Sequence, residues 1–276
     1  MKLSCLPVSY FQSMLEGALT IEYWAGEAAE LGLDAIDLSI VLNKNREAAY
    51  LEKLRQAIAA YGLKVNMLTT YPDFTHPEVS ERQRQHLLLK ENIDVAAALG
   101  AAMVRVTAGQ AHPGLTREAG LARAVAGLTG ALAYAGQRGV KLVYENHAKP
   151  AVWDYYDFSF PPDIFLDIVR ATAGSTLAIN FDTANPVAFG AAPLPLLEQV
   201  IDRVISIHAA ENRVWGRFEP AVFGAGVVPF VEIFAALKRV HFDGWISIEE
   251  ASRTGPAGVA HAVSFVRNAW AMKDGI

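Results

Sequence analysis

The chain has 276 residues, and 52% of them are hydrophobic, which is enough for one large core. Its formal net charge is −5, and Lys and Arg are scattered with no basic run longer than two, which argues against a nucleic-acid partner. The single cysteine excludes an intrachain disulfide and favours a reducing compartment. The first twenty residues hold no long apolar block, and no run of about 18 uncharged apolar residues occurs. We therefore expect a soluble, cytoplasmic protein with no membrane partner.

Short β-rich runs and amphipathic segments alternate along the chain. Eight runs have the composition of buried strands, at 2–8, 35–41, 64–70, 103–109, 140–146, 176–182, 203–209 and 245–251. Segments with helical spacing lie between them, for example 48–62 and 81–100. Several of these segments end at glycines that stand where a helix C-cap is expected, namely Gly32, Gly62, Gly100 and Gly139.

Eight strand–helix units without a linker or a break in composition predict one domain over residues 1–276. The predicted fold is an α/β (β/α)8 TIM barrel, because that fold requires eight such units in about this chain length. A doubly wound open sheet is the alternative, and the count of eight strands favours the barrel.

The last four predicted strands each end in a polar side chain. In chain order these residues are Glu145, Asp182, His208 and Glu249. Because side chains alternate along a strand, Ser206 and Val204 should face the same side as His208, with Ile205 on the other side. The same phase holds in the other three strands, and it turns Tyr144 toward the helices. We therefore expect the four end residues to converge at the mouth of the barrel, where barrel active sites lie.

Three carboxylates that meet without a cation would repel one another and would be costly to bury. One imidazole and three carboxylates make a suitable site for one divalent ion of intermediate hardness. We expect Mn²⁺, with Mg²⁺, Co²⁺ and Zn²⁺ as alternatives. Each residue alone could be a loop cap or an ion-pair partner, but four at successive strand ends favour a metal site.

Several short motifs resemble one known family. The segments "LVYENH", "INFDTANP", "VISIHAAEN", "FGAGVVPFVEIFAALK" and "DGWISIEE" are similar in order and spacing to the sugar phosphate isomerase/epimerase family of xylose isomerase-like TIM barrels. The resemblance implies that Glu145, Asp182, His208 and Glu249 bind one divalent metal ion. It also implies that Glu145 and Glu249 act as acid and base, and that the chain forms a homo-oligomer, a dimer or a tetramer.

The chain departs from that family's pattern at three positions. After the His of strand seven many members carry Lys and Asp, whereas this chain has Ala210 and Glu211. Where many members carry His after the Asp of strand six, this chain has Asn185. The substrate contacts that those groups make in relatives therefore do not carry over.

Weaker candidates lie in the loops after the strands. Five residues are candidates for substrate contacts, with a structural or solvated role as the alternative: His147, Lys149, Asn185, Arg213 and Arg217. Arg105 shares the inward phase of its strand and should form a buried structural pair, for which Asp37 is the expected partner. The aromatic loop 152–162 could be a lid, a sugar-stacking wall or a dimer contact.

These residues predict a metal-dependent isomerase or epimerase of a keto-sugar or a related polyol ketone. A metal held by two adjacent oxygens of a hydroxy-ketone stabilises the enediolate that forms when the carbon-bound proton leaves. Loss of a neighbouring hydroxyl would instead give a dehydratase, a lyase acting on a keto-polyol or a dehydroshikimate-like substrate. An endonuclease-like barrel, which would need further metal ligands and a basic rim, and a non-catalytic sugar-binding barrel are weaker alternatives.

Overall fold

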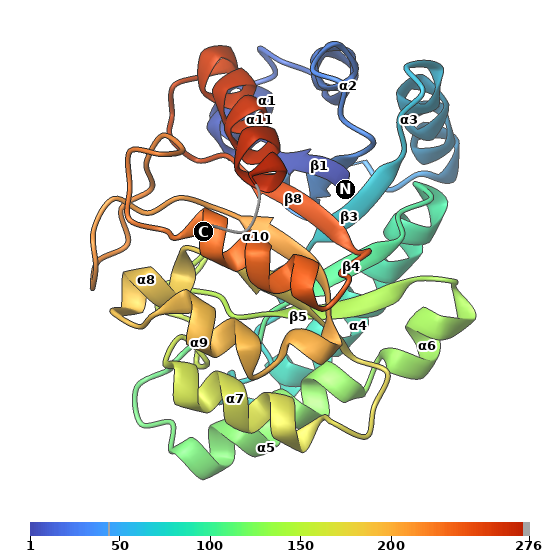
Figure 1. Ribbon diagram of the computed structural model, residues 1–276. Coiled ribbons are helices and arrows are strands. Elements are labelled where there is room, and N and C mark those ends of the chain that lie inside the picture. Colours follow the sequence, from blue (N-terminus) through green and yellow to red (C-terminus); the bar gives the residue numbers. More distant parts are fainter. Residues whose placement is uncertain (44, 273–276) are drawn as a thin grey trace.

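The computed structural model describes residues 1–43 and 45–272, and strands and helices alternate along it (Figure 1). All eight predicted strands form: β1 (Lys2–Leu6), β2 (Ile36–Ser39), β3 (Val65–Thr69), β4 (Met103–Val106), β5 (Lys141–Glu145), β6 (Ala178–Asp182), β7 (Val204–Ala209) and β8 (Trp245–Glu249).

The helices include both predicted examples, and the four predicted C-cap glycines all have positive φ. In chain order the α-helices are α1 (Phe11–Leu15), α2 (Ile21–Glu30), α3 (Ala48–Ala60), α4 (Val79–Ala98), α5 (Arg117–Thr129), α6 (Leu132–Gln137), α7 (Pro162–Ala171), α8 (Asn185–Phe189), α9 (Pro193–Glu198), α10 (Phe230–Arg239) and α11 (Pro256–Ala271). The described residues also form three short 3-10 helices, η1 (Val8–Tyr10), η2 (Ile40–Leu42) and η3 (Ile201–Arg203).

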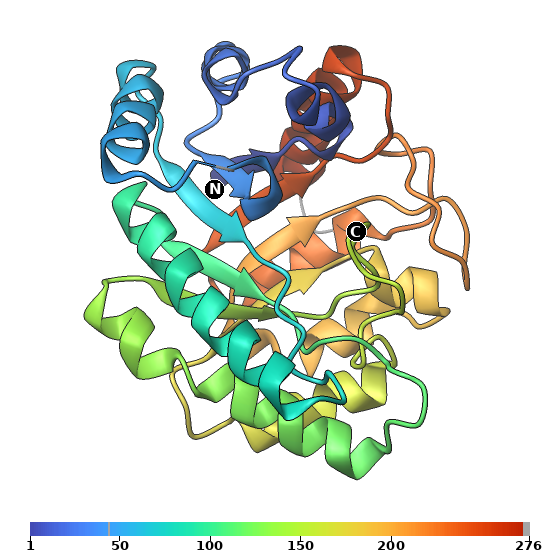
Figure 2. The same ribbon diagram turned by 180° about the vertical axis from the view of Figure 1, so that it is seen from behind.

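The eight strands form one parallel sheet in the order β1-β8-β7-β6-β5-β4-β3-β2. Asp34 bridges the remaining seam, between β1 and β2. Its N–H donates to the Leu3 carbonyl at 2.9 Å, and its Oδ2 accepts from the Leu3 N–H at 2.8 Å. The sheet is thus a nearly closed barrel, with the helices around its outside (Figures 1 and 2), and the open-sheet alternative is wrong.

Large apolar side chains of the strands face the helices, as the alternation predicts. Tyr144 is buried and packs on Phe165 of α7, with ring centroids 5.3 Å apart. A smaller cluster fills the barrel interior and draws on six strands: Met67, Met103 and Val143, with Ala178, Ile205 and Trp245 packed against them.

The predicted phase is wrong at the start of β7. Val204 belongs to the outer core and Ile205 packs inside, the reverse of the expectation. The cause is a shift of register between β6 and β7, because Ile179 pairs with Val204 while the next residue, Asn180, pairs with Ser206. One residue of β7 is therefore extra, and an irregularity of this kind changes which side of the sheet a residue faces.

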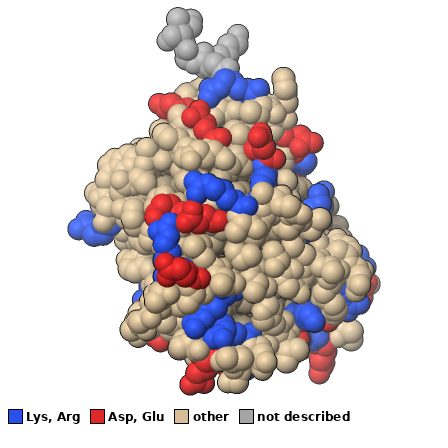
Figure 3. All heavy atoms as spheres, turned by 90° about the horizontal axis from the view of Figure 1, so that it is seen from below, with Lys and Arg blue, Asp and Glu red and all other residues tan. Residues whose placement is uncertain are grey.

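The surface carries charges of both signs. On the face seen in Figure 3, Lys and Arg side chains alternate with Asp and Glu, and neither sign gathers into one large patch. Among the residues that the structure describes, no helix is both long and apolar enough to span a bilayer.

Candidate metal centre

The ends of β5, β6, β7 and β8 bring the four predicted side chains together. One ligand atom from each of Glu145, Asp182, His208 and Glu249 lies within 4.8 Å of the other three. The register produces this meeting, because Asp182 pairs with His208 across neighbouring strands. The first three residues are buried, whereas 26% of the Glu249 side chain is exposed. Glu249 is therefore the member of the cluster that a molecule entering the mouth would meet first.

The charges of the cluster are unbalanced without a cation. His208 Nδ1 lies 2.5 Å from Glu145 Oε1 and 2.9 Å from Glu249 Oε2. Burial alone would lower the pKa of His208, but Glu145 and Glu249 outweigh it and raise that pKa well above its ordinary value. Burial and the charges of Glu249 and Glu145 raise the pKa of Asp182 well above its ordinary value. A bound cation would remove the repulsion that causes this shift.

The donor atoms themselves fit a metal ion. Nε2 of His208 is buried and has no hydrogen-bond partner among the described residues, while Nδ1 of His208 and Oε2 of Glu145 are buried with ion-pair contacts only. Buried polar atoms without a partner are costly, and coordination would satisfy them. Oxygen and imidazole ligands suit divalent ions such as Mn²⁺ and Mg²⁺. The cluster could therefore hold one such ion.

Glu145 is held in place from two further directions. The Asn180 amide donates to its Oε1 at 2.6 Å, and Arg105 Nε lies 3.3 Å from its Oε2. Burial would raise the pKa of Glu145, but Arg105 and His208 outweigh it and lower that pKa to about 2. The carboxylate is thus ionised and fixed in orientation.

The predicted pairing of Arg105 with Asp37 is wrong. Arg105 is buried as expected, but besides Glu145 its Nη1 donates to the Thr70 carbonyl at 3.0 Å, and its guanidinium lies 4.7 Å from the centre of the Tyr71 ring. Asp37 instead accepts from the hydroxyls of Ser4 and Ser247 and from the Asn66 amide. Asp37 is thus engaged by three neighbouring polar side chains, and Arg105 pairs with the carboxylate of the next strand.

Asn146 and Asn185 fix the loops beside Asp182. The Asn146 side chain donates to the Asp182 carbonyl at 2.9 Å and accepts from the Asp182 N–H at 2.8 Å. Asn185 is buried, and its amide donates to the Asn146 carbonyl at 3.0 Å. Asp182 Oδ1 accepts from the N–H groups of Ala184 and Asn185, which leaves Oδ2 for a ligand. The role of Asn146 was missed, although a polar residue directly after a strand end was a signal.

His147 and Lys149 occupy the loop after β5. Nε2 of His147 lies 3.8 Å from Glu145 Oε2, and its ring meets Trp153 edge-on with centroids 6.3 Å apart. Burial, with the charge of Arg105, lowers the pKa of His147 to about 4, so its imidazole is neutral near pH 7. Lys149 Nζ donates to the Asp154 carbonyl at 2.9 Å, which places its charge on its own loop.

Arg213 and Arg217, in the loop after β7, both pair with Glu219. Arg213 Nε lies 3.1 Å from Glu219 Oε1, and Arg217 pairs with the other oxygen. Half of the Arg213 side chain and 70% of the Arg217 side chain are exposed. The structure therefore places them in a surface ion-pair group.

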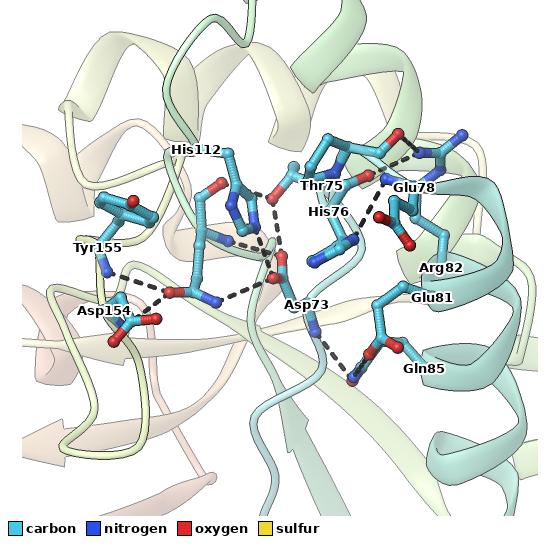
Figure 4. Close-up of polar contacts among 12 residues, drawn as sticks. Asp73, Thr75, His76, Glu78, Glu81, Arg82, Gln85, His112, Asp154 and Tyr155 are labelled. Carbon is cyan, nitrogen blue, oxygen red and sulfur yellow. Dashed lines mark hydrogen bonds and ion pairs between the residues drawn. The ribbon is translucent and has the colours of Figure 1, made fainter.

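A network of hydrogen bonds that the sequence reasoning missed anchors the aromatic loop 152–162 (Figure 4). Asp73, after β3, accepts from the Gln110 N–H and side-chain amide, both at 2.9 Å, and lies 2.7 Å from His112 Nε2. Gln110 Oε1 in turn accepts from the N–H groups of Asp154 and Tyr155 at 2.9 and 3.1 Å. Three loops of the rim are thus joined, so this loop is anchored at Asp154 and Tyr155.

The fold and the cluster together define a class: a (β/α)8 barrel with a three-carboxylate, one-imidazole group at the carboxyl ends of its strands. Residues 25–269 match the family described as xylose isomerase-like TIM barrel. The chain belongs to that family, which confirms the resemblance seen in the motifs.

One of the curated relatives is a named enzyme. The chain is 27% identical over 147 residues to inosose dehydratase from Geobacillus kaustophilus. The aligned segment covers 48% of this chain and 44% of that protein. The chain spans less than half the length of the curated relatives it matches.

Solved structures of epimerases share the fold. D-psicose 3-epimerase from Clostridium cellulolyticum H10 superposes with a TM-score of 0.79 at 15% identity, covering 98% of this chain and 99% of the other. For 3-keto-D-glucoside 4-epimerase from E. coli the TM-score is 0.75 at 17% identity, covering 97% and 99%. At this identity the likeness establishes the fold alone.

Proposed function

We propose that the protein is a divalent-metal-dependent isomerase or epimerase of a keto-sugar or related polyol ketone, acting through an enediolate. The observation that carries the proposal is that Glu145 and Glu249 approach the same atom, His208 Nδ1, from two different strands, at 2.5 and 2.9 Å. Two carboxylates from different strands of the same cluster can serve the two faces of a substrate bound beside that cluster. Family membership and the shared fold of two epimerases support this reading.

Glu145, Asp182, His208 and Glu249 would hold the ion, and Mn²⁺ is the proposed metal. When bound, the ion would supply a Lewis acid that polarises the ketone and stabilises negative charge on oxygen.

The two glutamates differ in burial and in their contacts. Glu145 is ionised and fixed by Asn180 and Arg105, so it can accept a carbon-bound proton without reorienting. Glu249 is partly exposed, so solvent reaches its carboxylate. Return of the proton to the same carbon from the opposite face gives an epimer, and return to the neighbouring carbon gives an aldose–ketose isomer.

A dehydratase is the second candidate, and the match to inosose dehydratase favours it. The first step would be the same proton removal by a glutamate. The difference is that a hydroxyl on the next carbon then leaves, which a proton from the second glutamate would assist.

Deuterium exchange tests the proposal and separates the two candidates. Ketoses and inososes would be incubated in D₂O with Mn²⁺-loaded protein, and products followed by mass spectrometry and ultraviolet absorbance. We expect deuterium at the carbon beside the carbonyl of a recovered sugar. Loss of water with a new enone absorbance would indicate the dehydratase, and neither change with any member of the panel would refute the proposal.

A further inference from the structure

We propose that the substrate is an uncharged keto-polyol that carries no phosphate group, an inference that rests on the function proposed above. The loops after strands seven and eight are where TIM barrels frequently bind phosphate, through backbone N–H groups and the N-terminus of a short helix. In this chain each of these loops contains a buried carboxylate of the protein itself, which accepts from three backbone N–H groups in the loop after β7 and from one in the loop after β8.

The loop after β7 closes around Glu211. This side chain is buried, and its Oε1 accepts from the N–H groups of Asn212 and Val228 at 3.0 and 3.1 Å. Its Oε2 accepts from the Gly224 N–H at 3.0 Å. Gly226 also packs directly against the carboxylate, at a point where any Cβ would collide with it. Three N–H groups converging on one carboxylate make an anion-binding turn whose anion is already present.

The loop after β8 also holds a buried carboxylate, which accepts from one backbone N–H and one hydroxyl. Glu250, directly after the predicted ligand Glu249, is 1% exposed. Its Oε1 accepts from the Ser252 N–H at 2.9 Å and from the Ser252 hydroxyl. The start of α11 comes close behind it, because a Cβ at Gly258 would stand 3.1 Å from the same oxygen. A phosphate entering either loop would have to displace a buried carboxylate or lie beside its charge.

Four basic side chains of the barrel and its rim are also engaged by other groups. Arg213 and Arg217 share Glu219, Lys149 donates to a carbonyl of its own loop, and Arg105 is buried against Glu145. A phosphate dianion is bound by arginines or lysines that are free to pair with it.

Arg253, in the loop after β8, is the cation that could overturn the inference. Its side chain is exposed and it follows Glu250 by three residues, while its backbone N–H is held by Ser9 Oγ at 2.8 Å. A single exposed guanidinium beside a buried carboxylate does not make a built phosphate site. We therefore infer that the protein recognises the hydroxyl groups of its substrate.

The first test compares matched pairs, such as D-fructose with D-fructose 6-phosphate and D-xylulose with D-xylulose 5-phosphate, in the Mn²⁺-dependent D₂O exchange. We expect kcat/KM for the phosphate ester to be lower than for its parent sugar by at least about 10-fold, since like charges placed together disfavour binding. A phosphate ester that exchanges as well as its parent, or better, would overturn the inference. So would an ester preference that Arg253→Ala abolishes.

The second test does not depend on turnover, so it still decides the inference if no sugar exchanges and the proposed function fails. Inorganic phosphate at millimolar concentration would be titrated into Mg²⁺-loaded protein while the amide resonances of Gly224, Val228 and Ser252 are followed by NMR. We expect these resonances to stay unchanged. A saturable shift at these amides would overturn the inference. The Glu211→Ala and Glu250→Ala variants serve as positive controls, in which the vacated N–H groups should bind phosphate.

Discussion

At the scale of single residues, Glu145 is the side chain on which the site converges. Arg105, Asn180 and His208 all act on its two oxygens, at 3.3, 2.6 and 2.5 Å. Arg105 is itself buried, so each partner compensates the other's charge in a place that water does not reach. Removing one of them should therefore cost far more than removing an ion pair at the surface.

The variant Arg105→Met tests this pair. It leaves the Glu145 carboxylate without its buried guanidinium, and the unfolding free energy of metal-free protein should fall by about 3–5 kcal/mol. Arg138→Met is the control, because Arg138 pairs with Asp94 at the surface and its loss should cost about 1 kcal/mol or less. Urea denaturation in the presence of EDTA measures both, and equal losses in the two variants would contradict this account.

Asp157 should make stability depend on pH. Burial raises the pKa of Asp157 to about 7, although the Ser159 N–H and hydroxyl both donate to its Oδ1 at 2.7 Å. In the unfolded chain an aspartate titrates near 3.9. Between about pH 3.9 and about pH 7, Asp157 is ionised in the unfolded chain but still protonated in the folded protein. The free energy of unfolding therefore falls as pH rises through this range, by up to about 4 kcal/mol.

The Asp157→Asn variant should remove that loss. The melting temperature of the variant minus that of the natural protein should be larger at pH 8 than at pH 5, because the amide of the variant does not ionise. Asp154→Asn, in the same loop, serves as the control and should follow the natural protein at both pH values. Thermal melts followed by circular dichroism measure the difference, and a constant offset between the two pH values would refute the assignment.

At the scale of elements, local sequence patterns predicted the strands. They did not predict which side chains contact each other between different strands. Alternation and C-cap glycines depend on near neighbours in sequence, and all eight strands were found from them. The irregularity before Ser206 depends on how β6 and β7 lie against each other, and so the phase of Val204 and Ile205 was misjudged. The wrong partner was predicted for Arg105 for a similar reason. The sequence does not tell which of the side chains that point into the barrel lie at the same level along its axis.

The four-residue cluster was predictable because each member ends a strand, and parallel strands end at one edge. The loop network around Asp73 was not, because it joins residues from three loops whose paths no periodicity determines. Its tightest point is Gly109, which has φ +119°, and a Cβ there would lie 2.7 Å from the Thr75 N and 2.8 Å from Asp73 Oδ1.

A pair of glycine variants tests how much this packing contributes. Gly109→Ala should lower the unfolding free energy by about 3 kcal/mol or more, because it adds overpacking to backbone strain. Gly114→Ala has the strain without the collision, since Gly114 has φ +77° and nothing within 4 Å of its Cβ position, and about 1–2 kcal/mol is expected. Chemical denaturation compares them. Equal costs would mean that the rim is not tightly packed at Gly109.

At the scale of the whole molecule, closure of the barrel is what creates the site. Strands five to eight place one carboxylate or imidazole each at a common edge, and curvature brings those ends to within 4.8 Å of one another. An open sheet would leave the same residues in a row, too far apart for one ion. The centre is therefore a property of the fold as much as of its four residues.

Metal content tests the central claim most directly. Purified protein would be stripped with EDTA, titrated with Mn²⁺ by calorimetry, and compared with Glu145→Gln, His208→Ala and the surface control Glu52→Gln. We predict one ion per chain in the natural protein and in the control, with binding lost or weakened by at least about 10-fold in the two site variants. Mn²⁺ binding as tight in both site variants as in the natural protein would contradict the account.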